Sequence, residues 1–320
     1  MPILVSRDRK SKWINAAVVP QKGNCAYAIK RLSEDVGALG YSRLVLKSDQ
    51  EPAIKELKAR VKMERAEDII MEESPAYEHR ANGEVERAIQ TVQGQVRTLK
   101  SALEARYNSP VGQDWSVLPW MVRHAGNAIN RYLRGTDGLT AYRRLKGKEF
   151  KRETAEFGEG VWYMRADIVG KAKLESRWED GIWLGIHEAS GEHIIGTKDG
   201  CLKAKDIKRK PEADRWMLED VQNMKGTPWE PVPGHPDREL KSKVVVREEP
   251  ILPPPEPSDE QPTMRRLYIR KKDIIKYGAT VGCEGCRAVV RGGVSRNHTE
   301  ECRARIEKAI REEGEGNSAQ

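Results

Sequence analysis

Apolar and polar positions alternate along the first 150 residues in blocks that predict strands and helices in turn. Short apolar runs predict strands, and apolar residues three or four positions apart predict helices. The expected strands cover 2–8, 13–19, 42–49 and 67–75, and the expected helices cover 24–39, a segment beginning at Pro52, 84–107 and 116–134. This order predicts an α/β domain whose last two strands are connected through helical crossovers.

Two of these segments carry a more specific pattern. Leu44, Val45 and Leu46 follow one another directly, which is typical of a strand covered on both faces. In the helix 84–107, one stripe of apolar residues recurs at spacings of four and three. A polar line runs beside that stripe at the same spacing and consists of Glu86, Gln90, Gln93, Arg97 and Lys100. The helix therefore has one face for the core and a polar line next to it.

The composition changes after residue 150. Residues 151–216 contain short β-type runs separated by glycines, which predicts a small β barrel or sandwich. Ten of the 17 prolines fall between Pro228 and Pro262, which predicts an extended, disordered linker over 217–263. Three of the five cysteines follow in a basic segment, 264–312, and the tail 313–320 is expected to be disordered.

Charge and cysteine content narrow the class of protein. Lys and Arg number 57 against 49 for Asp and Glu, a formal net charge of +8 that points weakly to nucleic acid as a partner. No stretch approaches the ~20 apolar residues of a membrane-spanning helix. Five cysteines are too few for a disulfide framework, and the N-terminus has no signal-peptide pattern. We expect an intracellular protein that is neither secreted nor bound to a membrane.

A zinc site is the strongest local signal. Cys283 and Cys286 are separated by two residues, and His298 and Cys302 by three, with eleven residues between the pairs. A tight turn and one helical turn can bring four such ligands together tetrahedrally around Zn²⁺. The alternative is a set of free cysteines near an unrelated histidine. Four protein ligands would leave no open position, so the predicted zinc site is structural.

Asp49 and Glu86 form a candidate acidic pair. Asp49 ends the strand 42–49, and sites in open α/β sheets form at that edge. Glu86 lies in the first turns of the helix reached after the next strand. Two neighbouring carboxylates could hold metal ions that align a hydroxyl and a leaving oxygen at phosphorus. The alternative is that each carboxylate is a helix cap or a solvated charge.

Several motifs resemble those of retroviral and copia-type retrotransposon integrases. Residues 82–87, Asn-Gly-Glu-Val-Glu-Arg, resemble the family's N-G-x-V-E-R motif, and residues 47–51 resemble its strand ending in S-D-x-x. Between Asp49 and Glu86 lie 36 residues, close to the 35 of the family's D,D-35-E triad. Residues 137–142 resemble the segment that closes the copia-type core, and the tryptophan-containing runs at 161–162 and 183–185 resemble the small β segment that follows it. The resemblance covers about residues 1–216.

The resemblance implies a fold, a chemistry and partners. It implies an RNase H-like core with a mixed sheet over 1–150, then an SH3-like β segment, in a nuclear or cytoplasmic protein. Asp49 and Glu86 would be catalytic and would bind Mg²⁺ or Mn²⁺. The resemblance also implies that the protein joins element ends to target DNA and forms a homo-oligomer. Glu84 competes with Glu86 for this role, but Glu86 matches the motif and shares the polar line of Arg97 and Lys100.

The family's first catalytic aspartate has no counterpart among the expected elements. Only two strands precede Asn24, whereas the family has three before its first helix. Asp8 is the early candidate, yet residues 7–11, Arg-Asp-Arg-Lys-Ser, fit the turn between the family's second and third strands. We therefore expect residues 1–320 to have impaired strand-transfer chemistry.

Basic residues offer possible contacts to nucleic-acid phosphates. The candidates are Arg87, Arg97 and Lys100 on the long helix, and Lys208, Arg209 and Lys210 at the end of the β segment. Each group could equally be a solvated face. The two hypotheses are an integrase-like enzyme with an incomplete triad and a non-catalytic DNA-binding or zinc-module adaptor protein derived from one.

Overall fold

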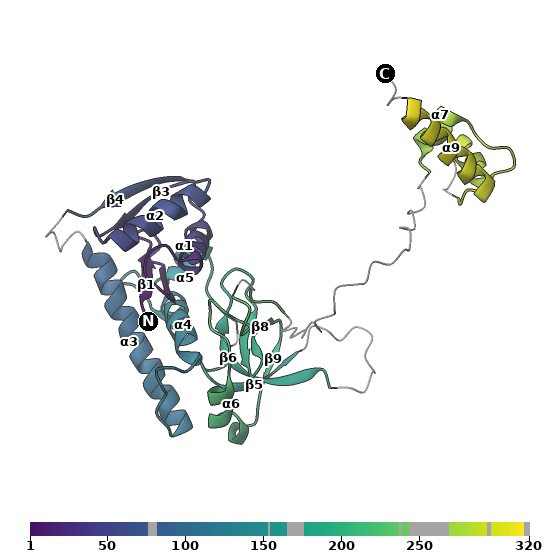
Figure 1. Cartoon of the computed structure of the whole chain (residues 1–320). Helices are drawn as coiled ribbons and strands as arrows, with labels where there is room; N and C mark the ends of the chain where they lie inside the picture. The colour runs from purple at the N-terminus through teal and green to yellow at the C-terminus, as the bar shows by residue number, and fades with distance from the viewer. Residues whose placement is uncertain are drawn as a thin grey trace. The chain divides into compact units, whose positions relative to one another are not determined.

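The computed structural model describes residues 1–75, 82–152, 154–164, 176–236, 239–242, 269–292 and 296–316. The chain divides into two compact units, Met1–Glu248 and Glu249–Gln320, which are described separately (Figure 1). No helix among the described residues is long and apolar enough to cross a membrane.

The first unit begins with alternating strands and helices. In chain order they are β1 (Ile3–Arg7), β2 (Ile14–Val18), α1 (Ala26–Leu39), β3 (Arg43–Ser48), α2 (Pro52–Glu64), β4 (Asp68–Glu73), α3 (Gly83–Tyr107), α4 (Val117–Tyr132) and α5 (Ala141–Lys146). Local chemistry sets several ends. Pro52 occupies the first turn of α2, where its missing N–H costs nothing. Gly40 ends α1 with a φ of 70°, in the left-handed region that glycine tolerates.

The strands form two separate pairs among the residues that the structure describes. β1 and β2 pair antiparallel, with Ile3 opposite Val18, and β3 and β4 pair parallel, with Arg43 opposite Asp68. The sequence predicted one mixed sheet. Among the described residues, no strand hydrogen-bonds to both pairs, so the two pairs remain separate sheets. The order of strands and helices is therefore the one expected of an α/β domain, whereas the hydrogen bonding between strands differs from the expected single sheet.

β3 is a strand, but the expectation that it is covered on both faces is wrong. Val45 is 52% exposed, and Leu44 and Leu46 are only half-buried. Leu44 and Leu46 pack on the cluster that contains Leu57 and Val61, so α2 covers one face. A continuous apolar run shows that both faces are apolar, but it does not supply a second covering element.

A five-stranded antiparallel sheet follows, within the range expected for the small β domain. Its strands are β5 (Gly160–Met164), β6 (Trp178–Ile186), β7 (His193–Thr197), β8 (Gly200–Ala204) and β9 (Ile207–Arg209), in the order β8-β7-β6-β5-β9. One of its faces packs on α4, where Trp120 and Met121 are completely buried in a shared cluster with Leu184 and Ile194. The N-terminal domain and the β sheet therefore share a core.

The first part of the expected linker is folded instead. After the short 3₁₀ helix η2 (Glu212–Asp214), helix α6 (Leu218–Asn223) buries Val221 and precedes the buried Met224. The indole N–H of Trp120 donates to the Gly226 carbonyl at 3.0 Å, and the Cys201 N–H donates to the Pro231 carbonyl at 2.7 Å. Apolar side chains spaced among the prolines explain why this segment packs. Residues 243–263 of the expected linker lie outside the described residues.

The second unit contains three described helices. They are α7 (Lys271–Tyr277), α8 (Glu284–Val290) and α9 (Glu300–Gly316). Its buried cluster joins Ile269, Ile274 and Ile306 to three cysteines. α9 continues through Gly316, so the first half of the tail expected to be disordered is helical, and residues 317–320 lie outside the described part.

Candidate metal centre and candidate acidic edge

The four predicted zinc ligands converge in the second unit. Cys283 is the N-cap of α8 and Cys286 lies in its first turn, while His298 and Cys302 flank the start of α9. Their ligand atoms all lie within 4.8 Å of one another. The sequence predicted this cluster from the spacing within the two pairs, and the structure places all four residues at or near helix starts.

The distances suit a tetrahedral zinc ion. His298 Nδ1 lies 3.5 Å from Cys283 Sγ and 3.6 Å from both Cys286 Sγ and Cys302 Sγ, and Cys286 Sγ lies 3.4 Å from Cys302 Sγ. Zn–S bonds near 2.3 Å and Zn–N bonds near 2.0–2.1 Å give ligand–ligand edges of about 3.5–3.8 Å. Three sulfurs and one imidazole nitrogen are a donor set that Zn²⁺ prefers, so the residues present fit this metal.

Gly285 is a supporting residue that the sequence motif alone did not single out. A Cβ atom at this position would lie 2.7 Å from His298 Nδ1 and 2.9 Å from the Arg296 carbonyl oxygen. Real Cβ atoms essentially never approach so closely. Position 285, directly before Cys286, must therefore be glycine for the His298 ring to reach the cluster. The only sequence feature that could have pointed to Gly285 is its place inside the Cys-x₂-Cys segment.

The thiols of this cluster differ in acidity. Burial raises the pKa of Cys283, but backbone hydrogen bonds from Cys286 and Thr299 and the contact with His298 bring it down to about 6. Burial raises the pKa of Cys302 to about 11. The Cys283 thiolate is therefore readily available at neutral pH, whereas the proton of Cys302 has to be displaced when a metal binds.

The predicted acidic pair lies at the joined ends of β3, β4 and α3. Asp49 directly follows β3, is exposed, and its Oδ1 accepts the N–H of Glu51 at 3.2 Å. Gln50 Nε2 donates to the Ser74 carbonyl at 3.1 Å, and Ser74 Oγ donates to Asn82 Oδ1 at 2.5 Å. These two hydrogen bonds connect the residue after Asp49, the end of β4 and the N-cap of α3.

Glu86 and its competitor Glu84 have different surroundings in the first turn of α3. Glu84 forms ion pairs with Lys12 at 3.6 Å and Arg9 at 3.9 Å, so it faces the β1–β2 turn. Glu86 is exposed, and no hydrogen bond or ion pair among the described residues engages it or joins it to Asp49. Part of the family-like segment, residues 76–81, lies outside the described residues.

Asp8 lies where the resemblance expected a turn. It follows β1 and accepts hydrogen bonds from the Ser11 N–H at 2.7 Å, the Ser11 hydroxyl at 2.5 Å and the Tyr41 hydroxyl at 2.9 Å. Burial raises the pKa of Asp8, but these hydrogen bonds outweigh burial, so the pKa lies below its ordinary value. The carboxylate is used to hold the hairpin turn.

The predicted nucleic-acid contacts fall into two groups. Arg87, Arg97 and Lys208 are exposed, and the Lys208 ammonium lies 4.4 Å from the centre of the Trp178 ring. The others bind carboxylates of the protein. Lys100 pairs with Glu104 at 2.7 Å, Arg209 with the fully buried Glu159 at 2.7 Å, and Lys210 with Asp180 at 2.6 Å.

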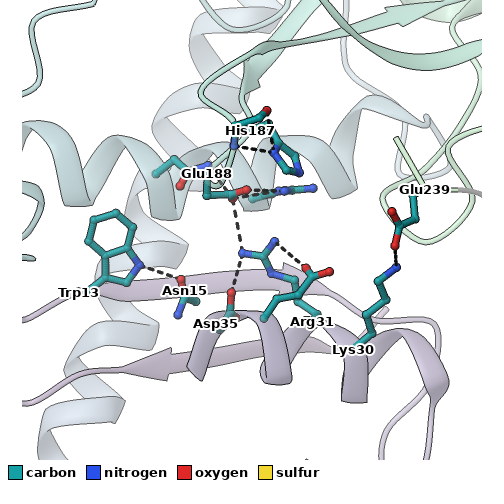
Figure 2. A network of polar contacts seen from close by, with 12 residues as sticks. Trp13, Asn15, Lys30, Arg31, Asp35, His187, Glu188 and Glu239 are labelled. Carbon is teal, nitrogen blue, oxygen red and sulfur yellow. Dashed lines mark hydrogen bonds and ion pairs between the residues drawn. The ribbon is translucent and has the colours of Figure 1, made fainter. Parts of the chain in front are cut away.

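A buried ionic network between α1, α4 and the β6–β7 loop was not predicted (Figure 2). Glu188 accepts hydrogen bonds from Arg123 Nε and Asn127 Nδ2, each at 3.0 Å, and lies 3.5 Å from Arg31 Nη2. Arg31 also pairs with Asp35 at 2.6 Å. Burial raises the pKa of Glu188, yet Arg123 and Arg31 outweigh it and hold the pKa well below its ordinary value. Burial raises the pKa of Asp35 to about 6.

Comparisons with known proteins add two structural likenesses. No family model matches the sequence, and no curated protein sequence is significantly similar. The catalytic core domain of BIV integrase is similar at 18% identity, over 45% of this chain and 85% of that chain, with a TM-score of 0.32. The simian T-cell lymphotropic virus intasome in complex with the PP2A regulatory subunit B56 gamma is similar at 16% identity, over 65% of this chain and 72% of that chain, with a TM-score of 0.34. Both are retroviral integrase structures.

Proposed function

We propose that this protein is an integrase-like nucleic-acid-binding protein whose strand-transfer chemistry is impaired within residues 1–320. The observation that carries the proposal is the acidic edge. Asp49 and Glu86 stand at motif-like positions, and hydrogen bonds through Gln50, Ser74 and Asn82 connect the elements that carry them. This support comes from residues 1–107 and is independent of the two similar solved structures.

Mg²⁺ or Mn²⁺ is the metal that the acidic edge would hold. Oxygen ligands suit both ions, and both carboxylates are exposed and form no ion pair within the described part of the chain. Two such ions would stabilise charge on the attacking and leaving oxygens at phosphorus. Asp49 and Glu86 are two of the three carboxylates of the family's triad, and Asp8 is occupied by its turn. Residues 1–320 therefore bind metal weakly and do not position both ions.

Nucleic-acid binding would rest on exposed cations. Arg87 and Arg97 on α3 and Lys208 on β9 are the candidates for phosphate contacts, whereas Arg209 and Lys210 support them by fixing β9. Such contacts release counterions, so the affinity should fall steeply with salt. The second unit contributes a structural zinc module.

The test uses purified residues 1–320 with end-labelled duplex DNA and Mg²⁺ or Mn²⁺. We expect DNA to be bound with a salt-dependent affinity and its ends not to be joined to target DNA. Joining activity that disappears in Asp49→Asn but survives in Asp68→Asn, a matched exposed carboxylate on β4, would overturn the claim of impaired chemistry. Absence of DNA binding at low salt would overturn the nucleic-acid role.

An adaptor role for the zinc module is the second candidate. It is favoured by one observation: the four-ligand metal cluster is complete, whereas the acidic edge offers two carboxylates. Deletion of residues 264–320 separates the two candidates. DNA affinity that survives the deletion supports the integrase-like core as the binding part, and affinity that is lost supports the module.

A further inference from the structure

A basic cavity lies at the end of α4, next to α5 and the β6–β7 loop. Its volume is about 670 Å³, within the range of cavities that hold small ligands. Five cationic side chains contribute to its lining: Arg131, Arg143, Lys148, Lys151 and Arg152. None of these residues belongs to the acidic edge or to the candidate nucleic-acid contacts.

Arg131 is the buried cation of this cavity. The residue is only 8% exposed, and its guanidinium carbon lies 4.5 Å from the centre of the Phe150 ring. Its Nε is buried without a hydrogen-bond partner, and no ion pair engages the group in the described part of the chain. The same side chain also lines a second cavity of about 300 Å³. A buried guanidinium without an ion-pair partner is costly, so an anionic ligand would offset its desolvation.

The acidic groups at the cavity are fewer than the cations, and they have partners of their own. Glu149 pairs with Arg143 at 2.9 Å. Glu188 hydrogen-bonds to Arg123 and Asn127, and it forms no ion pair with Arg131, although its charge favours the protonated form of that guanidinium. Burial and the nearby Arg123 lower the pKa of His187 to about 4, so that this ring is neutral at pH 7. With five cationic side chains and two carboxylates, Glu149 and Glu188, in its lining, the cavity has an excess of positive charge.

Aromatic side chains form the apolar part of the wall. Tyr142 and Phe150 both line the cavity, and their ring centres are 5.4 Å apart at an interplanar angle of 79°. A flat organic ring can lie against such side chains while a phosphate reaches the guanidinium. Arginine suits this task because its planar fork binds two phosphate oxygens at once.

We propose that this cavity binds a nucleotide, with the phosphate on Arg131 and the base against Tyr142 and Phe150. The phosphate could belong to a free mononucleotide or to the end of a nucleic-acid strand. Both sources offer the same chemistry to the cavity. The inference does not depend on the acidic edge or on strand transfer.

Calorimetric titration of the full chain tests the proposal with four probes. They are inorganic phosphate, deoxyadenosine, deoxyadenosine monophosphate and a short single-stranded oligonucleotide with a 5′-phosphate. We expect the monophosphate to bind more tightly than inorganic phosphate, and deoxyadenosine not to bind detectably. An oligonucleotide that displaces the monophosphate and binds more tightly identifies the strand end as the source, and the reverse order identifies the free nucleotide.

Arg131→Gln should weaken monophosphate binding about 10- to 100-fold, because a charge-assisted hydrogen-bonded contact is lost. Arg60→Gln, which removes an exposed arginine from α2, is the matched control and should change nothing. Because Arg131 is buried, circular dichroism and thermal melting check that its variant folds. The exposed pair Lys148→Gln and Lys151→Gln provides a second test with a smaller expected loss. No binding of the monophosphate by the wild-type chain, or unchanged binding by both folded variants, would overturn the proposal.

Discussion

Several buried charged side chains of the first unit gather around Glu188. Its carboxylate serves Arg123, Arg31 and Asn127 together, and none of these partners is near it in the sequence. Removing one member of a buried ion pair leaves the other charge uncompensated in a poorly solvating environment. The stability of the first unit should therefore depend strongly on this one side chain.

Glu188→Gln should lower the free energy of unfolding by about 3 kcal/mol at pH 7, because two buried arginines lose their shared carboxylate. The folded-state pKa of Glu188 is held well below its ordinary value of 4.5. Its contribution is thus fully present above pH 4.5 and is lost as the pH falls through the folded-state pKa. Urea denaturation from pH 7 to pH 3 should show a smaller acid-induced loss in the variant.

Glu34→Gln is the control for this measurement. Glu34 lies 3.9 Å from the same arginine, Arg31, but its side chain is 54% exposed. A solvated ion pair contributes less than about 1 kcal/mol. Equal losses in the two variants would contradict the role assigned to the buried network.

Cys302→Ser should abolish stoichiometric zinc in the second unit, because a serine hydroxyl is a poor replacement for a thiolate ligand. Cys25→Ser, in the first unit, should leave the zinc content unchanged. Metal analysis by mass spectrometry of freshly purified, reduced protein checks both variants. Zinc retained at one equivalent in Cys302→Ser would exclude Cys302 as a ligand.

Some residues of the candidate sites could be predicted from the sequence, and others could not. The zinc ligands were predictable, because they form two closely spaced pairs, Cys-x₂-Cys and His-x₃-Cys, whose chemistry is local. Glu188 was not, since its partners Arg31 and Arg123 are far away in the chain and no motif joins them. Arg209 and Lys210 were interpreted as phosphate contacts, but the carboxylates of Glu159 and Asp180 could not be matched to them before the strands were paired.

Among the elements, the segment after β9 differs most from its predicted structure. Proline content predicted a linker from residue 217, yet the segment through residue 236 packs against α4 and β8. Proline removes backbone donors but leaves the side chains between prolines able to bury. Helices and strands with a clear apolar period were predictable, whereas the exposure of one face of β3 was not.

A chain shortened to residues 1–216 should be less stable than a chain of residues 1–242. The shorter chain lacks Val221, Met224 and Val232, which are 1%, 3% and 7% exposed. Burying each side chain contributes roughly 1.5–3 kcal/mol, and their loss also exposes the Trp120 surface. Thermal melting compares the two chains, and equal midpoints would show that the segment adds nothing to the core.

For the whole molecule, the two compact units should respond differently to metal removal. All four zinc ligands belong to the second unit, which has a small apolar cluster of its own. Zinc supplies ~10–16 kcal/mol in finger peptides, enough to decide whether such a module folds. The first unit is held by several hydrophobic clusters without these ligands.

A zinc chelator should therefore unfold the second unit and leave the first intact. Hydrogen–deuterium exchange followed by mass spectrometry should show lost protection over 283–306 and unchanged protection in α3 and α4. Re-addition of Zn²⁺ should restore the protection, whereas Mg²⁺ should not. Protection of α8 and α9 that survives chelation would contradict a metal-dependent module.

The contact between Arg31 and Glu188 spans 157 residues of sequence. A ribosome that adds ~5–20 residues per second needs roughly 8–30 s to synthesise that interval. During this time the Arg31 side chain has no Glu188 to bind, and water must solvate the end of the guanidinium that later faces it. The surface between α1 and the β6–β7 loop can therefore close only late in synthesis, and a chain stalled before residue 188 would leave it open.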